Sequence, residues 1–231
     1  MLFKSNALKI CVLLISLLIT NIAYSQSTSW DSTFRPASYD VKVAQFKSYA
    51  NSPDDIIFLG NSITANTDWS ELLGMPNIKN RGISGDITFG IIERLHEVVE
   101  GKPAKVFILI GVNDISRNIP HNYIVENYRK IVKGIKAGSP ETKIYIQTLL
   151  PTNNTYDKFK NHYNKDEKIL AVNQAIKDIA SSENITLIDL YPHFLDSEKK
   201  LDKKYTIDGL HLSALGYMKW KEVLEKGGYL K

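Results

Sequence analysis

Short apolar runs rich in β-branched residues alternate with longer amphipathic stretches along this chain, which limits the folds open to it. A short apolar run predicts a buried strand, whereas apolar residues at helical spacing predict a helix packed on one face. The predicted strands cover residues 56–59, 77–83, 104–111, 142–150 and 185–190. The predicted helices cover residues 41–49, 87–99, 123–137, 165–182 and 213–226. Such alternation is typical of an α/β fold with a parallel sheet and helices on both faces.

The beginning of the chain has the pattern of a secretory signal peptide. Lys4 and Lys9 precede an apolar run at residues 10–19, and small residues follow it. This order predicts cleavage after Ser25 and export to a bacterial periplasm or to the cell exterior. The apolar run is short for a membrane span. Cys11, the only cysteine, lies at the wrong end of the run for a lipoprotein.

The remaining residues, 26–231, are predicted to form a single domain. The sequence is 43% hydrophobic and shows no internal repeat, low-complexity segment or linker, so one core can serve the whole segment. The full chain has 29 basic and 25 acidic side chains, and removal of Lys4 and Lys9 leaves the mature protein nearly neutral. This charge does not favour a nucleic-acid partner. The mature protein contains no cysteine and therefore no disulfide.

A serine follows the first predicted strand at a position that suits a nucleophile. The strand ends at Gly60, and Ser62 lies two residues later, where the chain turns towards a helix. A serine at such a junction exposes its hydroxyl at the edge of the sheet, and its own N–H points into a helix start. The alternative is that Ser62 only caps the helix, as serine commonly does.

The segments that follow the other strands carry further polar residues. In a doubly wound sheet, ligands bind beyond the carboxyl ends of the strands. These segments are Gly82–Asp86, Gly111–Asp114, Leu150–Asn153 and, before the last helix, Asp208–His211. A nucleophile, amide donors and an acid–imidazole pair are therefore expected along one edge of the sheet.

Asp208 and His211 are the predicted acid and base. Their spacing lets the carboxylate accept a hydrogen bond from one imidazole nitrogen while the other nitrogen faces the hydroxyl of Ser62. A surface pair is the alternative interpretation of the same spacing. His193 competes with His211, because it follows the fifth strand and lies near Asp189. The other histidines, His96, His121 and His162, are predicted within helices or at their starts and are poorer candidates.

Two further residues are candidates for stabilising an oxyanion. Asn113 carries a side-chain N–H₂ group, and Gly85 offers a backbone N–H that an acyl group can approach closely. Both residue types are also common in plain turns, so their alternative role is turn formation. The N–H of Ser62 would be a third donor.

Taken together, four segments resemble the conserved blocks of the GDSL, or SGNH, hydrolases. These segments are Gly60–Ile63, Ser84–Asp86, Gly111–Asp114 and Asp208–His211, and the resemblance extends over roughly residues 54–228. It implies a three-layer α/β/α sandwich with a flavodoxin-like, five-stranded parallel sheet. It also implies a Ser62–His211–Asp208 triad, an oxyanion hole formed by Ser62, Gly85 and Asn113, and no cofactor or metal. Asn61 departs from the pattern, because the family has Asp at this position.

The resemblance also suggests a substrate class. Residues 80–86 and 205–212 are similar to the branch that contains platelet-activating-factor acetylhydrolase-like and sialate O-acetylesterase-like proteins. This branch implies a serine esterase for short acyl groups, acetyl first, and in an exported bacterial enzyme O-acetylated carbohydrates. Trp69, Asp86 and Tyr156 are the expected substrate contacts.

Three alternative functions follow from the same residues. One is a lysophospholipase or another acyl-lipid esterase of the same family. A second is a metal-dependent phosphoesterase, because Asp114, Asp208 and His211 are also plausible metal ligands. It lacks an early Asp-x-His pair and leaves Ser62 without a role. A third is an inactive glycan-binding module, against which an intact triad argues.

Overall fold

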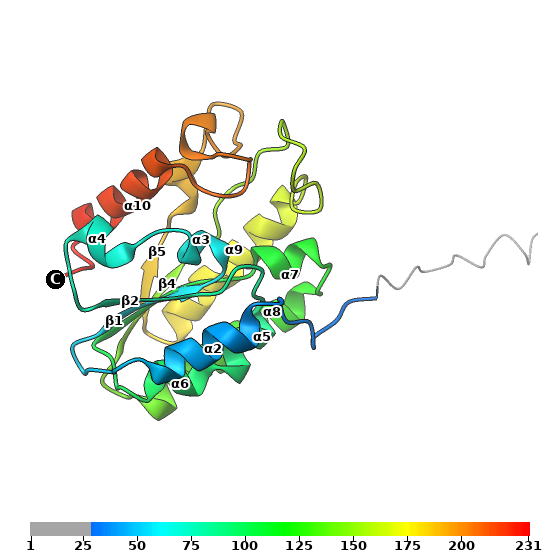
Figure 1. Ribbon diagram of the computed structural model, residues 1–231. Helices are drawn as coiled ribbons and strands as arrows, with labels where there is room; N and C mark the ends of the chain where they lie inside the picture. Colours follow the sequence, from blue (N-terminus) through cyan, green and yellow to red (C-terminus); the bar gives the residue numbers. More distant parts are fainter. Residues whose placement is uncertain (1–28) are drawn as a thin grey trace, which may run out of the picture.

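Five parallel strands form the centre of the computed structural model, which describes residues 29–231 (Figure 1). The strands are β1 (Ile56–Gly60), β2 (Ile78–Gly82), β3 (Lys105–Leu109), β4 (Lys143–Gln147) and β5 (Thr186–Ile188). Their order in the sheet is β2-β1-β3-β4-β5, and every neighbouring pair is parallel. This topology confirms the predicted flavodoxin-like sheet. The predicted signal peptide lies outside the described residues.

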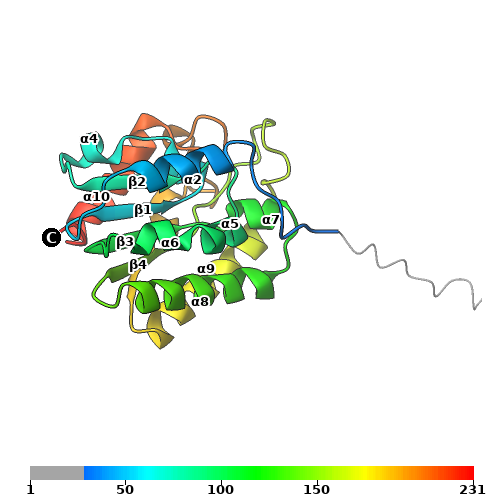
Figure 2. The ribbon, with the colours of Figure 1, turned by 60° about the horizontal axis from the view of Figure 1, so that its bottom comes forward.

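Each strand sends alternate side chains to opposite faces of the sheet, and both faces are covered. One face packs against helices α2 (Tyr39–Ser48), α5 (Thr88–Glu93), α6 (Leu95–Val99), α8 (His121–Gly138) and α9 (Asp166–Ser182). The other packs against α4 (Trp69–Leu73) and α10 (Ala214–Lys226). Figure 1 shows these two layers on opposite sides of the sheet. Figure 2 shows α2, α6 and α8 side by side across the first face.

Aliphatic side chains dominate the core on the α8 and α9 side, whereas aromatic ones are prominent on the α10 side. From β1, Ile57 and Leu59 join the aliphatic core, and Ile56 and Phe58 join the other. The ring of Phe58 stacks on that of Phe107 with centroids 4.8 Å apart. Both cores therefore depend on the same strands, and the sheet positions everything that follows its carboxyl ends.

The strand register brings the carboxyl ends of β2, β1 and β3 level. Gly60, the last residue of β1, pairs with Gly82 of β2 and with Leu109 of β3. A Cβ atom on Gly60 would lie 2.3 Å from the backbone oxygen of Leu109. Glycine is therefore required where β1 ends and the chain turns into the site.

The segment 87–99 differs from the single helix predicted for it. It forms two short helices, α5 and α6, which are separated at Arg94. Arg94 adopts φ −98° and ψ 10°, and its side chain is fully buried, where it contacts acidic side chains and backbone carbonyls. The break therefore coincides with a buried charge, which an apolar periodicity does not reveal.

Among residues 29–231, no helix is both long enough and apolar enough to cross a membrane.

Candidate active site

Ser62 is the first residue of α3 (Ser62–Ala65), a single helical turn that follows β1 directly. Asn61 caps this turn, because its Oδ1 accepts a hydrogen bond from the N–H of Ile63 at 3.0 Å. An aspartate could accept the same bond, so the Asn61 departure from the family pattern keeps the cap. Because Ser62 lies in the first turn, no carbonyl of the helix accepts a hydrogen bond from its N–H.

The hydroxyl of Ser62, the imidazole of His211 and the carboxylate of Asp208 form a continuous chain. Ser62 Oγ lies 3.0 Å from His211 Nε2, and His211 Nδ1 lies 2.9 Å from Asp208 Oδ2. Burial disfavours the charge on Asp208, but hydrogen bonds from the N–H and the ring of His211 lower the pKa of this carboxyl below its ordinary value. Because a carboxylate only accepts hydrogen bonds, Nδ1 carries the imidazole proton and Nε2 presents its lone pair to Ser62.

The loop that carries Asp208 and His211 is fixed by hydrogen bonds. Asp208 Oδ1 accepts the N–H of His211 at 2.8 Å and that of Leu210 at 3.1 Å. Thr206 Oγ1 donates to the backbone oxygen of His211 at 2.7 Å. Gly209 has a positive φ of 80°, and a Cβ atom there would lie 2.4 Å from the backbone oxygen of Asn153. The acid and the base are therefore held in one orientation before any substrate binds.

Gly85 and Asn113 lie on the same cleft as Ser62 and His211. Gly85 has a φ of 83°, a conformation that favours glycine. Asn113 Nδ2 donates one hydrogen bond to the backbone oxygen of Asp86 at 2.9 Å. An amide nitrogen carries two hydrogens, so one N–H of Asn113 remains for a ligand.

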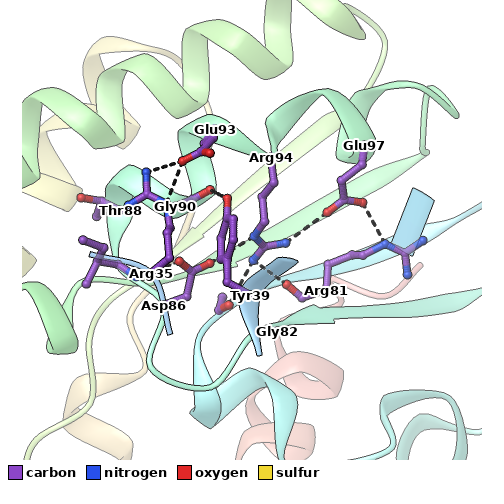
Figure 3. Close-up of polar contacts among 12 residues, drawn as sticks. Arg35, Tyr39, Arg81, Gly82, Asp86, Thr88, Gly90, Glu93, Arg94 and Glu97 are labelled. Carbon is purple, nitrogen blue, oxygen red and sulfur yellow. Dashed lines mark hydrogen bonds and ion pairs between the residues drawn. The ribbon is translucent and has the colours of Figure 1, made fainter. Parts of the chain in front are cut away.

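A buried ionic network surrounds Arg94 (Figure 3). Arg94 Nε contacts Asp86 Oδ2 at 3.1 Å, and its Nη1 contacts Glu97 Oε1 at 3.1 Å. Glu97 also pairs with Arg81 at 3.1 Å. Arg94 Nη2 donates to the backbone oxygens of Arg81, at 2.8 Å, and of Gly60, at 3.3 Å.

This network contacts residues that are near Ser62 and Gly85 in the sequence. Gly60 lies two residues before Ser62, and Asp86 follows Gly85 directly. The backbone oxygen of Asp86 in turn orients the amide of Asn113. One buried side chain, that of Arg94, thus contacts the strand end that leads to Ser62 and the residue that follows Gly85.

The expected substrate contacts need correction. Trp69 is 1% exposed, with its ring stacked 4.1 Å from that of Phe58, so it belongs to the core rather than to the cleft. The side chain of Asp86 is completely buried against Arg94 and cannot meet a substrate. Tyr156 is half-buried beside Gly209 and does not line the cleft.

His193 does not line the cleft that Ser62 lines. It lies in a 3₁₀ turn, Tyr191–Phe194, where its own side chain is exposed and Phe194 is buried. Asp189 pairs instead with Lys177 at 2.7 Å. The structure therefore brings His211, and not His193, to Ser62.

Two residues at the cleft were missed or undervalued by the sequence patterns. His162 lies in a turn before α9, and its Nε2 is 2.9 Å from Asn113 Oδ1. Phe159 lies edge-on to the ring of His211, with centroids 4.9 Å apart. Both follow β4, so their place beyond a strand end was the signal that could have identified them.

The cleft has a volume of about 700 Å³, and polar residues outnumber apolar ones along it. Near the triad and the two donors it also contains Trp30, Asp31, Asn66, Ser84, Ser116, Arg117, Asn161 and Leu210. Trp30, Phe159 and Leu210 are apolar residues of its lining. The cleft thus combines a hydroxyl group, an oriented imidazole and N–H donors, which are the groups that acyl transfer requires.

Comparison with known proteins agrees with this chemistry. A sequence model of the GDSL-like lipase/acylhydrolase family matches residues 58–219. Platelet-activating factor acetylhydrolase IB subunit alpha2 of Rattus norvegicus is 27% identical over 172 residues, which cover 71% of this chain and 72% of that protein.

Solved structures with the same architecture come from proteins with several names. A Streptococcus pneumonia protein provisionally named a platelet activating factor is 29% identical, with a TM-score of 0.75, over 94% of this chain and 98% of that one. The acetyl xylan esterase AlAXEase is 22% identical, with a TM-score of 0.63, over 75% of this chain and 98% of that one. At that identity, the second likeness concerns the fold alone.

Proposed function

Because the chain belongs to the GDSL-like lipase/acylhydrolase family, we propose that it is a serine esterase that removes short acyl groups, acetyl first, from carbohydrates. The observation that carries the proposal is the continuous chain from Ser62 Oγ through His211 to Asp208, with separations of 3.0 and 2.9 Å. Ser62 and the loop that carries Asp208 and His211 are far apart in the sequence, yet the hydroxyl and the imidazole meet.

The proposed reaction has two halves. His211 Nε2 takes the proton of Ser62 while Oγ forms a bond to the ester carbon, and the carbonyl oxygen becomes an oxyanion. The bond to the alcohol then breaks, and the alcohol leaves with the proton from His211. Water attacks the acyl-enzyme in the same way, its proton passes to His211, and the acid is released as Ser62 regains its hydrogen.

The oxyanion would be stabilised by the N–H groups of Ser62 and Gly85 and by the free N–H of Asn113. Removal of one such donor typically raises the barrier by about 2.7–4 kcal/mol. Asp208 contributes by holding the imidazole in the required tautomer and by compensating the positive charge that His211 acquires.

The cleft supports a polar substrate with a short acyl group. Asn66, Ser84, Ser116 and Asn161 offer hydrogen bonds to sugar hydroxyls, and Trp30 adds an aromatic side chain to the lining. The name of one similar protein, an acetylhydrolase, also refers to acetyl groups. These observations favour an acetyl ester of a carbohydrate over the ester of a long-chain lipid.

Turnover is expected to fall steeply as the acyl chain grows from acetyl or butyryl to octanoyl. Each methylene gains about 0.8 kcal/mol only if it enters an apolar environment, and few lining side chains are apolar. We would measure kcat/KM for p-nitrophenyl esters of rising chain length and then acetate release from acetylated xylan. Faster turnover of octanoyl esters would instead favour an acyl-lipid esterase.

Esterase activity is also expected to survive exhaustive dialysis against EDTA, because the Ser62–His211–Asp208 chain supplies nucleophile and base without a metal. Within residues 29–231, no three His, Cys, Asp or Glu side chains are grouped so that they could hold a metal ion. Loss of activity on chelation, with recovery on addition of a divalent cation, would favour the metal-dependent phosphoesterase.

A further inference from the structure

The side-chain amide of Asn113 is held at both ends. Its Nδ2 donates to the backbone oxygen of Asp86 at 2.9 Å, and a carbonyl oxygen can only accept, so the orientation of the amide is determined. Its Oδ1 therefore points the other way, where it lies 2.9 Å from Nε2 of His162. The mechanism described above gives His162 no role.

The contact also determines where His162 carries its proton. An amide oxygen cannot donate, so Nε2 must be the donor. Nδ1 is buried and has no hydrogen-bond partner among residues 29–231. A second proton on Nδ1 would thus be buried without an acceptor.

The surroundings of His162 keep its ring neutral. Burial first, and then the nearby charges of His211 and Arg117, lower the pKa of His162 to about 4. At neutral pH the ring is therefore a fixed Nε2–H donor and not a base.

The segment that carries His162 contacts both halves of the active site. Tyr163 donates its hydroxyl to the backbone oxygen of Asp208 at 2.5 Å. The ring of Phe159 lies edge-on to His211 on one side and to His162 on the other, with centroid distances of 4.9 and 5.9 Å. His162 is thus fixed relative to the same loop that positions the base.

From this geometry we infer that His162 is a positioning residue for Asn113, the side-chain donor of the proposed oxyanion hole. The inference rests on the proposed esterase function. With both ends of the amide held, the remaining N–H of Asn113 has one direction. Without His162, one hydrogen bond, to the backbone oxygen of Asp86, holds the amide of Asn113. The amide can then rotate, and its remaining N–H loses alignment with the oxyanion.

The expected loss is in turnover rather than in substrate affinity, because the oxyanion forms only in the transition state. Removal of an oxyanion donor typically lowers kcat about 10²–10³-fold. Loss of the residue that aligns the donor should cost less, on the order of 10-fold, with KM little changed.

Two substitutions separate the hydrogen bond from the shape of the ring. In His162→Gln, the side-chain amide can donate from nearly the position of Nε2 but has no ring. In His162→Phe, the ring and its contact with Phe159 remain, but the donor is lost. We expect His162→Gln to stay within a few-fold of the wild type and His162→Phe to lose kcat about 10-fold. Loss in His162→Gln with full activity in His162→Phe would overturn the inference.

A double-mutant cycle with Asn113→Ala tests whether His162 acts through Asn113. We expect His162→Phe to cause no further loss of kcat once Asn113 is alanine, since interacting residues give non-additive effects. If the losses of kcat in the two single variants multiply in the double variant, His162 does not act through Asn113. The pH–rate profile of His162→Gln should match that of the wild type. A shifted acid limb would assign His162 to proton transfer and contradict the inference.

A measurement independent of activity separates this inference from the proposed function. If the wild type hydrolyses no ester, the proposed esterase function is refuted. The contact between His162 and Asn113 can still be tested by nitrogen-15 NMR of the histidine rings. We expect His162 as the neutral Nε2–H tautomer from about pH 5 upward, with its Nε2 resonance shifted in Asn113→Ala. An Nδ1–H tautomer, or a cationic ring at pH 6, would overturn the inference.

Discussion

Replacement of Ser62 by alanine is expected to lower kcat for ester hydrolysis by a factor on the order of 10³ or more while the protein stays folded. The hydroxyl is the group that attacks the ester, and its Oγ contacts His211 at 3.0 Å. Little stability should be lost, because the substitution removes a single oxygen atom from a small side chain that lines the cleft. We would measure kcat with a p-nitrophenyl ester and the melting temperature by circular dichroism.

Ser84→Ala is the matched control for this substitution. Ser84 lines the same cleft but does not contact His211, so its turnover should remain within a few-fold of the wild type. A folded Ser62→Ala variant that keeps more than a few per cent of the activity would exclude Ser62 as the nucleophile.

The second large effect is expected at His211. His211→Ala should lower kcat by a factor on the order of 10³ or more, because the members of a triad act as a unit. His193→Ala should leave both kcat and the melting temperature nearly unchanged, since the side chain of His193 is exposed and distant from the cleft. Loss of turnover in folded His193→Ala, with retention in His211→Ala, would refute the assigned base.

The pH dependence of the rate follows from the same base. His211 must be neutral to accept the proton of Ser62, so kcat/KM should rise with pH as the imidazole loses its proton. Neither Asp208 nor His162 is expected to cause this rise of kcat/KM with pH. The pKa of Asp208 lies below its ordinary value, and that of His162 is about 4. The rise of kcat/KM with pH should be the same in Ser84→Ala as in the wild type.

The sheet and the segments at its edge could be predicted because local sequence determines both. A buried parallel strand is a continuous apolar run, and residues that follow parallel strands must meet at one edge. Ser62, Asn113 and His211 could therefore be expected to lie together, and the structure places all three on one cleft. Their catalytic roles remain predictions until the substitutions are measured.

The errors share a physical cause, which is that sequence spacing does not determine the direction of a side chain. Trp69 lies near Ser62 in the sequence, but its ring turns inward onto Phe58 and its Nε1 donates to the backbone oxygen of Thr64 at 2.8 Å. Asp86 follows a strand end as expected, yet the buried charge of Arg94 draws its carboxylate away from the cleft.

His162 illustrates a limit of a different kind. Its importance depends on the orientation of Asn113, which in turn depends on a backbone oxygen 27 residues away in sequence. No periodicity or motif carries such information.

Covalent trapping tests most directly whether Ser62 is the nucleophile. A p-nitrophenyl alkylphosphonate forms a stable bond to an activated serine and releases p-nitrophenol, and the modified residue can be located by tandem mass spectrometry. The proposed mechanism predicts one phosphonyl group per chain on Ser62, parallel loss of esterase activity, and no labelling of Ser62→Ala or His211→Ala. Labelling of a different residue, or esterase activity that persists with Ser62 fully modified, would contradict it.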